Sequence, residues 1–300
     1  MDIGERFRGS LLGLAVGDAL GTSLEFRQRG SFEPITDMLG GGPFCLEPGQ
    51  WTDDTAMALC LATSLVECGG FDARDQMLRY CRWADHGYLS STGKCFDIGN
   101  TVRTALDRFR RDGNPFAGAT DPRGAGNGCI MRLAPIALYF FPDLEQVEAS
   151  AAASSRTTHG AQECVDGTRL FARMLCRALS GATKAEVLDG DSAGFSAGPL
   201  ILAIARGEYR SRSAEKIRGT GYVVQSLEAA LWAFDRTSNY SEAVLAAANL
   251  GEDADTTAAI CGQLAGAHYG EAGIPPLWRS RLALGAEIAD LADRLGARTK

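Results

Sequence analysis

The sequence predicts an all-α fold, a compact bundle of many helices in a single domain that spans residues 1–300. Apolar residues recur at the 3.6-residue period of an amphipathic helix along most of the chain. Alternating runs of Val, Ile and Thr, which would indicate strands, hardly appear. Hydrophobic residues make up 45% of the chain and charged residues 22%, a composition that can fill a sizeable core.

The first helix is expected to begin near Ile3, because Ile3, Phe7 and Leu11 follow the helical period. It should end in a glycine-marked loop that carries Glu25. Several glycines and prolines between residues 27 and 50 predict a flexible connection to the next helix.

The rest of the chain is predicted to continue as helix after helix. Pro135 is expected to kink or restart the helix around it, and the glycine-rich residues 190–198 are expected to form a disordered surface loop. The further helices are predicted at about residues 54–68, 72–85, 143–154, 162–180, 197–206, 221–237 and 240–250, with others near residue 100 and after residue 253, and a last pair after residue 276.

Two acidic clusters, far apart in the sequence, stand at predicted helix starts. In one of them, Asp253, Asp255 and Thr256 begin a helix whose Gly262 and Gly266, four residues apart, would let a neighbouring helix come close. Taken alone, the cluster is equally well explained by helix capping, because acidic side chains at a helix N-terminus accept from free amides and complement the helix dipole.

The second cluster also runs into a predicted helix. If the two helix starts meet, their carboxylates and hydroxyls form an all-oxygen cradle with enough negative charge for two divalent cations. His and Cys, which zinc prefers, are missing from both clusters, so we expect Mg²⁺ or Mn²⁺. The predicted ligands are Thr52, Asp53, Asp54, Asp253, Asp255 and Thr256.

Charge and cysteine content narrow the functional class. The net charge of −7 argues against binding of polymeric nucleic acid, which needs clustered Lys and Arg. No apolar run reaches the roughly 18 to 20 residues of a membrane span, and no signal-peptide pattern is present at residue 1. The nine cysteines are scattered, odd in number and without a C-x-x-C pair, so we expect reduced thiols and a cytoplasmic location.

Five short motifs occur along the chain: GLAVGDALG at residues 13–21 with Glu25-Phe26, WTDDT at 51–55, GNGCIMR at 126–132, Thr158-His159, and GEDADT at 251–256. In these residues the chain, from about Gly9 to about Gly270, resembles the ADP-ribosylglycohydrolases, the family that includes the dinitrogenase-reductase-activating glycohydrolase. The resemblance implies an orthogonal multi-helix bundle with a binuclear metal site in a central cleft.

The resemblance also assigns roles to residues outside the metal clusters. It places Glu25 on a mobile loop beside the substrate ribose, whereas a lone Glu on a loop is more often a solvated acid. It sets Asp97, with Asn100 three residues later, against the guanidinium of a modified arginine, for which a carboxylate is a fork-shaped partner. Both residues could instead be capping groups. Tyr222 is expected opposite Asp97.

A glycine-rich loop and one histidine complete the implied substrate site. The loop of Gly126, Asn127 and Gly128 is assigned to the substrate diphosphate, with backbone amides free to point at an anion. Without the family, a plain turn is the simpler interpretation. His159 matches the family's Thr-His pair near the ribose, and ordinary packing is the alternative.

The implied activity is metal-dependent hydrolysis of the glycosidic bond between ADP-ribose and a modified group, with an arginine side chain of a protein as the favoured acceptor. Glu25, Asp54 and Asp255 are the expected catalytic carboxylates, and the choice of general base stays open. The alternatives are another linkage, such as ADP-ribosyl-serine or a small ADP-ribosyl metabolite, and a module that binds ADP-ribose without cleaving it. We expect a monomer.

Glu252 departs from the family pattern, which often has Gly-Gly before Asp-Ala-Asp-Thr. If residue 252 has a positive φ, a Glu there costs about 1 kcal/mol or more. We expect its side chain to point away from the metals or to bond a metal-bound water.

Overall fold

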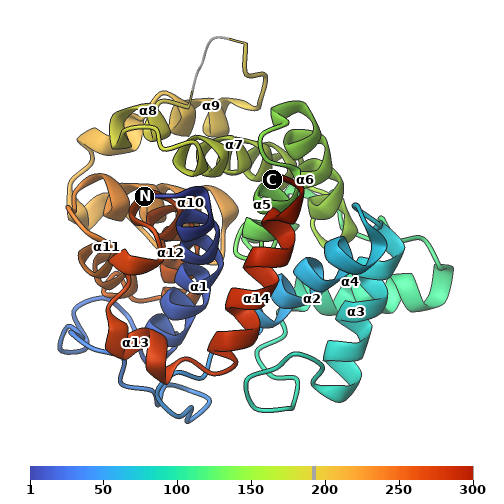
Figure 1. The fold of residues 1–300 in the computed structure, drawn as a ribbon, viewed down its shortest axis with the longest axis horizontal. Helices are drawn as coiled ribbons and strands as arrows, with labels where there is room; N and C mark the ends of the chain where they lie inside the picture. The colour runs from blue at the N-terminus through green and yellow to red at the C-terminus, as the bar shows by residue number, and fades with distance from the viewer. Residues whose placement is uncertain (191–193, 300) are drawn as a thin grey trace.

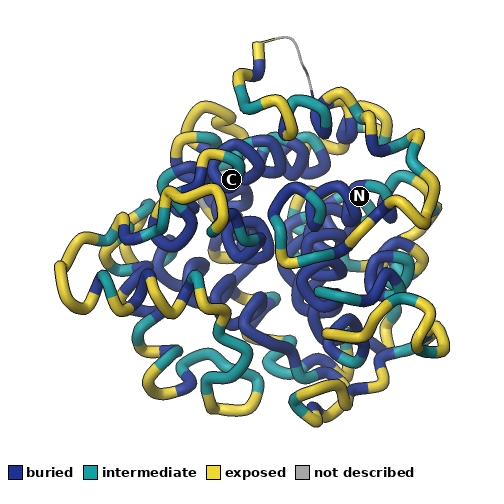
Figure 2. Tube along the Cα trace, turned by 180° about the vertical axis from the view of Figure 1, so that it is seen from behind, coloured by how far each residue is buried: buried dark blue, intermediate teal, exposed yellow. Residues whose placement is uncertain are grey.

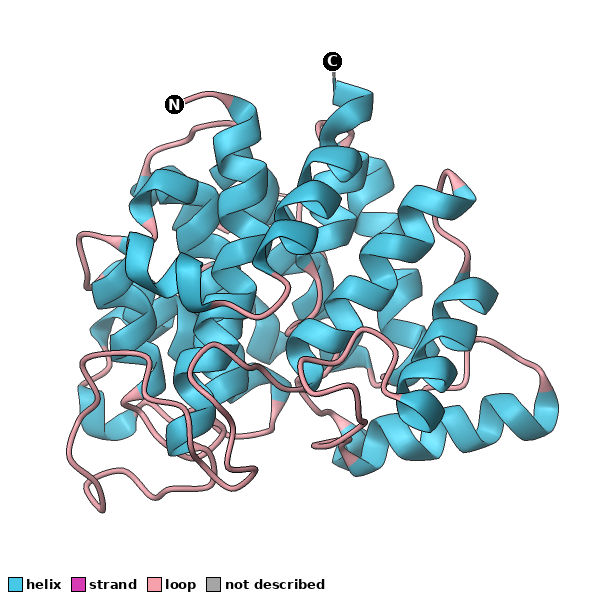
Figure 3. Ribbon diagram, turned by 60° about the horizontal axis from the view of Figure 1, so that its bottom comes forward, coloured by secondary structure: helices cyan, strands magenta, loops and turns pink. Residues whose placement is uncertain are grey.

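Helices account for nearly all the regular structure of the protein, which we describe over residues 1–190 and 194–299 of a computed structural model (Figure 3). No β-sheet occurs in these two ranges, where the only strand-like pairings are three isolated bridges. The helices cross at many angles rather than running parallel (Figure 1). The predicted all-α fold is confirmed.

Fourteen α-helices and six short 3₁₀-helices follow one another in the described residues. The α-helices are α1 (Ile3–Gly21), α2 (Asp53–Cys68), α3 (Ala73–His86), α4 (Asn100–Asp112), α5 (Ala134–Phe140), α6 (Leu144–Thr158), α7 (Gln162–Leu179), α8 (Lys184–Leu188), α9 (Pro199–Ala205), α10 (Val223–Asp235), α11 (Tyr240–Ala248), α12 (Ala254–Tyr269), α13 (Pro276–Arg281) and α14 (Gly285–Leu295). The 3₁₀-helices are η1 (Thr22–Leu24), η2 (Pro122–Gly124), η3 (Glu208–Ser211), η4 (Ala214–Lys216), η5 (Glu271–Gly273) and η6 (Gly296–Thr299).

The centre of the fold is a close contact between α1 and α12, the first and the twelfth helix (Figure 1). Gly13 on α1 faces Gly262 on α12, and a β-carbon on either residue would overlap the carbonyl oxygen of the other. The same relation holds between Gly9 and Gly266. The prediction that Gly262 and Gly266 admit a neighbouring helix is confirmed, and the contact brings the C-terminal half of α1 to the start of α12.

Gln263 on α12 fixes the segment that leads into α5. Its Nε2 donates to the carbonyl oxygen of Met131 at 2.7 Å, and its Oε1 accepts from the amide of Ala134 at 2.7 Å. Because Gln263 is fully buried, these bonds are shielded from water and replace the solvation that its amide loses. The glycine-rich loop before residue 131 is thereby held at a defined place beside α12.

Buried residues lie in the middle of the molecule and exposed residues on its outside (Figure 2). Trp51 and Trp83 are among the largest of the fully buried side chains, and both belong to one core cluster that also includes residues of α1 and α12. No helix in the described part of the chain is both long and apolar enough to cross a membrane.

Of the two outcomes predicted for Pro135, a kink or a restart, the structure shows the restart, because Pro135 occupies the first turn of α5, where it needs no amide partner. The helices differ from the predicted ones in two other places. Helix α6 continues to Thr158, four residues past its predicted end. Helix α8 was not predicted, because it is only five residues long; a capping box between Thr183 and Glu186 begins it. Of the glycine-rich stretch 190–198, residues 191–193 lie outside the described residues.

Candidate functional site

A cleft of about 730 Å³ opens where the N-terminal ends of α2 and α12 come together. Asp54 and Asp255, which lie in the first turns of these helices, are buried at its base. Most of the predicted site residues line it: Glu25, Asp53, Asp97, Asn100, Gly126, Asn127, Gly128, His159, Asp253 and Thr256.

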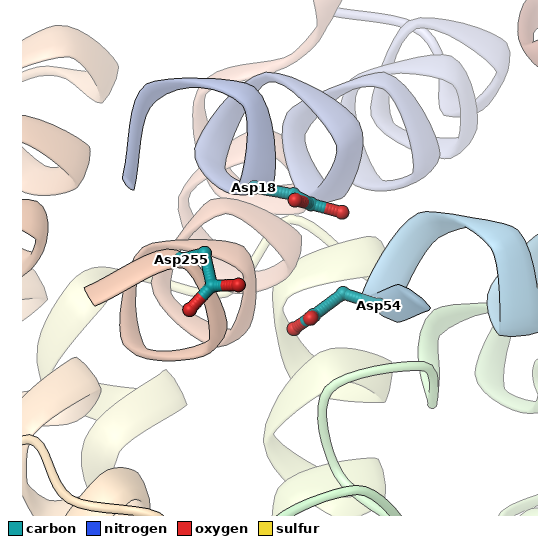
Figure 4. A group of neighbouring side chains, drawn as sticks. All are labelled: Asp18, Asp54 and Asp255. Atoms are coloured by element: carbon teal, nitrogen blue, oxygen red, sulfur yellow. The ribbon is translucent and has the colours of Figure 1, made fainter. Parts of the chain in front are cut away.

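Three carboxylates from three helices meet at the base of the cleft. Figure 4 shows Asp18 of α1, Asp54 of α2 and Asp255 of α12 pointing toward one another. Each offers an oxygen that lies within 4.8 Å of the others. The glycine contact between α1 and α12 explains why Asp18 and Asp255 can come so close. Both Asp54 and Asp255 also benefit from the positive end of their own helix dipole.

Thr52 shows that this cluster needs positive charge. Its Oγ1 lies 2.9 Å from Asp18 Oδ1, 3.2 Å from Asp54 Oδ2 and 3.2 Å from Asp255 Oδ2. A hydroxyl has one proton and can donate to only one of these oxygens. Extra protons or cations must therefore neutralise the negative charge of the other carboxylate oxygens.

The surroundings of the acids that line the cleft and lie at its base disfavour their ionised forms. Burial, followed by the charge of Asp18, raises the pKa of Asp54 well above its usual range. Burial and the charge of Glu25 do the same to the pKa of Asp255. Asp54 Oδ1, Asp255 Oδ1 and Glu25 Oε2 are also buried without a hydrogen-bond partner. An all-oxygen set with orphaned carboxylate oxygens fits hard divalent cations.

Glu25 and Asp97 lie beside this cluster. Glu25, Asp97 and Asp255 form a second group of acids whose oxygens lie within 4.8 Å of one another. Burial, and next the charge of Asp97, raise the pKa of Glu25 to about 10. Asp97 has a φ of 57°, in the left-handed region that most residues avoid. The surrounding loop therefore imposes this orientation on Asp97, which is partly buried.

The loop that carries Glu25 is hydrogen-bonded to the loop before α12. The amide of Phe26 donates to the carbonyl oxygen of Glu252 at 2.7 Å. The amide of Glu252 donates to the carbonyl oxygen of Arg27, also at 2.7 Å. Glu252 has a φ of 61°, so the backbone strain considered for this position is present. These two bonds connect Glu25 to Asp253 through a short stretch of backbone.

The glycine-rich loop packs against His159. A β-carbon on Gly128 would lie 2.7 Å from His159 Cε1, and one on Gly126 would lie 3.1 Å from His159 Nε2. Larger residues at these positions would displace the imidazole. The amides of Gly126 and Asn127 donate to the carbonyl oxygens of Gly124 and Gly221, so these two amides are not free for an anion, contrary to the prediction. The Asn127 side chain instead positions a predicted metal ligand, because its Nδ2 donates to Asp253 Oδ2 at 2.6 Å.

Comparison with known proteins agrees with this geometry. Over residues 1–300 the chain matches the sequence model of the family described as ADP-ribosylglycohydrolase. The chain belongs to the ADP-ribosylglycohydrolase family. The resemblance drawn from the five motifs is confirmed.

Three similar proteins illustrate the relationship. The ADP-ribosylarginine hydrolase Tri1 of Pseudomonas putida (strain GB-1) is 47% identical over 291 residues, which cover 97% of this chain and 78% of that protein. The ADP-ribosyl-[dinitrogen reductase] glycohydrolase of Rhodospirillum rubrum is 32% identical over 289 residues, which cover 94% of this chain and 92% of that protein. A solved structure described as an ADP-ribosylglycohydrolase-related protein complex superposes with a TM-score of 0.88 at 42% identity and covers 99% of both chains.

In this ADP-ribosylglycohydrolase, Asp18 has a role that sequence reasoning missed. Its Oδ1 accepts from the amide and the hydroxyl of Thr52, both at 2.9 Å, and its Oδ2 accepts from the amide of Thr55 at 3.0 Å and its hydroxyl at 2.6 Å. Asp18 therefore holds the start of α2 in place. The signal was its position directly after Gly17 in the first family motif, on the helix that meets α12.

In this ADP-ribosylglycohydrolase Asn100 lines the cleft, whereas Tyr222 is not among the residues that line it. Asn100 is exposed, begins α4 and lines the cleft three residues after Asp97. Tyr222 precedes α10, and its hydroxyl donates to Glu163 Oε2 at 2.7 Å. Its neighbour Gly221 lines the cleft. A position of Tyr222 opposite Asp97 stays a prediction.

Proposed function

We propose that the protein is a metal-dependent hydrolase that cleaves the N-glycosidic bond between ADP-ribose and an arginine side chain of a protein. The observation that carries this proposal is the placement of Asp97, whose carboxylate lies in the cleft within 4.8 Å of oxygens of Glu25 and Asp255. A carboxylate at this point is the natural partner of a planar guanidinium. The names of two relatives, ADP-ribosylarginine hydrolases at 47% and 42% identity, support the same linkage.

The predicted metal ligands would hold two divalent cations, Mg²⁺ or Mn²⁺. They are Thr52, Asp53, Asp54, Asp253, Asp255 and Thr256, drawn from the starts of α2 and α12. When bound, such cations orient the ribose hydroxyls and lower the pKa of water. The hard oxygen ligands and the orphaned oxygens Asp54 Oδ1 and Asp255 Oδ1 support this assignment.

The side chains of the cleft would then act on the bond itself. The bond between the anomeric carbon of the distal ribose and the guanidinium nitrogen breaks, and its electron pair stays on the nitrogen, which takes up a proton. Water supplies the hydroxyl that bonds to the anomeric carbon, so the products are ADP-ribose and unmodified arginine. The transition state resembles an oxocarbenium ion, which the surrounding carboxylates stabilise.

Two acids are assigned to the leaving group and to proton transfer. Asp97 pairs with the guanidinium; burial raises the pKa of Asp97 to about 7, and an entering cation favours its ionised form. Glu25 lies beside Asp97 in the cleft and, because its pKa is raised, can hold and pass on a proton near neutral pH. Glu25, Asp54 and Asp255 are the proposed catalytic carboxylates, with the general base to be decided among them.

We propose further that residues 1–300 form one domain, which acts as a monomer in the cytoplasm on ADP-ribosylated protein. The nine cysteines, all within the described residues, are free thiols, which suits a reducing compartment. The acidic net charge of −7 supports a partner other than polymeric nucleic acid.

Release of ADP-ribose from ADP-ribosyl-arginine, followed by chromatography, tests the proposal. We expect a chelator to abolish release and Mg²⁺ or Mn²⁺ to restore it. Full turnover in excess chelator would contradict metal dependence, and rescue by Zn²⁺ alone would contradict the oxygen-ligand assignment. Binding of ADP-ribose without any cleavage in Mg²⁺ or Mn²⁺ would favour a binding module instead.

A further inference from the structure

Arg132 is a fully buried cation beside the cleft, and the proposed reaction gives it no task. Its guanidinium carbon lies 4.8 Å above the ring of Tyr80. Its Nη2 donates to Thr158 Oγ1 at 2.6 Å and, more weakly, to the carbonyl oxygen of Ser154 at 3.5 Å. A guanidinium can only donate hydrogen bonds, so Thr158 Oγ1 must accept.

Thr158 also contacts His159, so the direction of its hydrogen bond with Arg132 affects the imidazole. Thr158 Oγ1 lies 2.8 Å from His159 Nδ1. A threonine oxygen has two lone pairs, so accepting from Arg132 does not by itself prevent it from accepting from an Nδ1–H as well. Within the described residues, however, Thr158 Oγ1 bonds only to Arg132 Nη2 and His159 Nδ1, so Nδ1 is the acceptor left for the hydroxyl proton. A buried hydroxyl keeps its proton paired, and Nδ1 then carries a lone pair rather than a hydrogen. A neutral imidazole whose Nδ1 is unprotonated carries its hydrogen on Nε2. The buried arginine therefore determines which ring nitrogen of His159 is the donor.

The Nε2 edge of the ring faces the cleft. His159 lines the cleft, and its Nε2 is next to the glycine-rich loop, 3.1 Å from the place of a β-carbon on Gly126 and 3.1 Å from that on Gly128. The ring also stays neutral, because burial and then the charge of Arg132 lower the pKa of His159 to about 3. The cleft therefore receives a neutral N–H donor from a side chain that is 2% exposed.

We propose that Arg132 and Thr158 are positioning residues that fix His159 as the neutral Nε2–H tautomer, so that it donates a hydrogen bond to an acceptor oxygen of the bound ADP-ribosyl group. This rests on the proposed function for the identity of the ligand. The other tautomer would present a lone pair at Nε2, which repels a diphosphate oxygen and can only accept from a ribose hydroxyl. The acceptor is either a diphosphate oxygen or a hydroxyl of the distal ribose. ADP contains only the diphosphate of these two groups and ADP-ribose contains both, so comparing the two ligands identifies the acceptor.

Nitrogen NMR of the ¹⁵N-histidine-labelled full chain in Mg²⁺ tests the proposal without any turnover. The chain has only three histidines, so His159→Gln identifies the His159 signals. We expect a protonated Nε2 and an unprotonated Nδ1 that do not change from pH 8 to pH 5. A protonated Nδ1, or a ring that titrates near pH 6.5, overturns the proposal and leaves the proposed hydrolase activity intact.

Ligand titration in the same samples identifies the acceptor. A shift of the Nε2–H signal with ADP assigns the oxygen to the diphosphate, and a shift only with ADP-ribose assigns it to the distal ribose. No shift with ADP-ribose at saturation overturns the proposal. If ADP-ribose binds and shifts the signal but no substrate is cleaved, the proposal holds and the hydrolase assignment falls.

Two substitutions test the relay through Thr158. Thr158→Val keeps the shape of the side chain and removes the hydroxyl, so Nδ1–H should become populated and the Kd for ADP-ribose should rise about 3- to 10-fold, the value of one hydrogen bond. Thr158→Ser keeps the hydroxyl and should restore the tautomer and the affinity. A folded Thr158→Val protein with unchanged nitrogen signals and affinity overturns the relay.

Discussion

The Glu252 carboxylate forms an ion pair with the guanidinium of Arg218, in which Arg218 Nε donates to Glu252 Oε2 at 3.0 Å and a second, shorter bond joins Nη2 to Oε1. Both residues line the mouth of the cleft. The extra acid of this chain is therefore directed at a cation on the rim, as expected for a side chain that points away from the metals. Because Arg218 is largely exposed, the pair contributes little to stability.

Substitutions of Asp255 and Glu252 should consequently differ in their effect on metal binding. Asp255→Asn removes a charge from the buried cluster, so Mg²⁺ affinity should fall at least 10-fold, the loss expected even when a residue behind a metal ligand is changed. Glu252→Gln removes a charge that Arg218 already neutralises and should leave Mg²⁺ affinity nearly unchanged. Calorimetric titration measures both. Equal Mg²⁺ affinity for Asp255→Asn and the parent protein would remove Asp255 from the site.

The glycine contact between α1 and α12 should be sensitive to a single methyl group. Gly262→Ala places a β-carbon against the carbonyl oxygen of Gly13, so the helices must separate. We expect a loss of about 1 to 3 kcal/mol in the free energy of unfolding, measured in urea. The matched control is Gly70→Ala, whose β-carbon meets no atom within 4 Å and should change stability by less than about 0.5 kcal/mol. Similar stabilities for the two variants would show that the helices are not held this closely.

His159 should make the protein less stable in acid. In the folded chain burial lowers the pKa of His159 to about 3, whereas in the unfolded chain it is near 6.5. Below pH 6.5 the unfolded state binds a proton that the folded state does not, so folding is penalised increasingly as pH falls, by up to about 1.4 kcal/mol per pH unit. The stability of the parent relative to His159→Gln should therefore decrease from pH 6.5 to pH 4. A difference that is constant with pH would show that His159 protonates in the folded state.

The parts of the site that follow from local sequence were predictable. Asp53, Asp54, Asp253 and Asp255 stand next to the starts of apolar helices, and such starts can be located from helical periodicity and capping residues. The spacing of Gly262 and Gly266 likewise indicated a close helix neighbour. These features depend on residues a few positions apart, which is the range over which sequence patterns are informative.

The remaining parts depend on contacts between distant segments. Asp18 binds Thr52 and Thr55 only because α1 and α2 meet, and nothing in the sequence near residue 18 indicates that partner. The bond from Asn127 to Asp253 joins residues 126 positions apart, and the one from Tyr222 to Glu163 joins residues 59 positions apart. Side-chain partners of this kind follow from the tertiary packing and could not be predicted from a single sequence.

The central claim, hydrolysis of the arginine linkage, is tested most directly by offering ADP-ribosyl-arginine and ADP-ribosyl-serine peptides side by side to the parent protein and to Asp97→Asn. Asn tolerates the φ of 57° at this position, so the substitution changes charge rather than backbone. We predict that the parent cleaves the arginine peptide faster, and that Asp97→Asn loses about 2 to 5 kcal/mol of transition-state stabilisation for it while binding free ADP-ribose normally. Faster cleavage of the serine peptide, or an arginine reaction that Asp97→Asn leaves intact, would contradict the account.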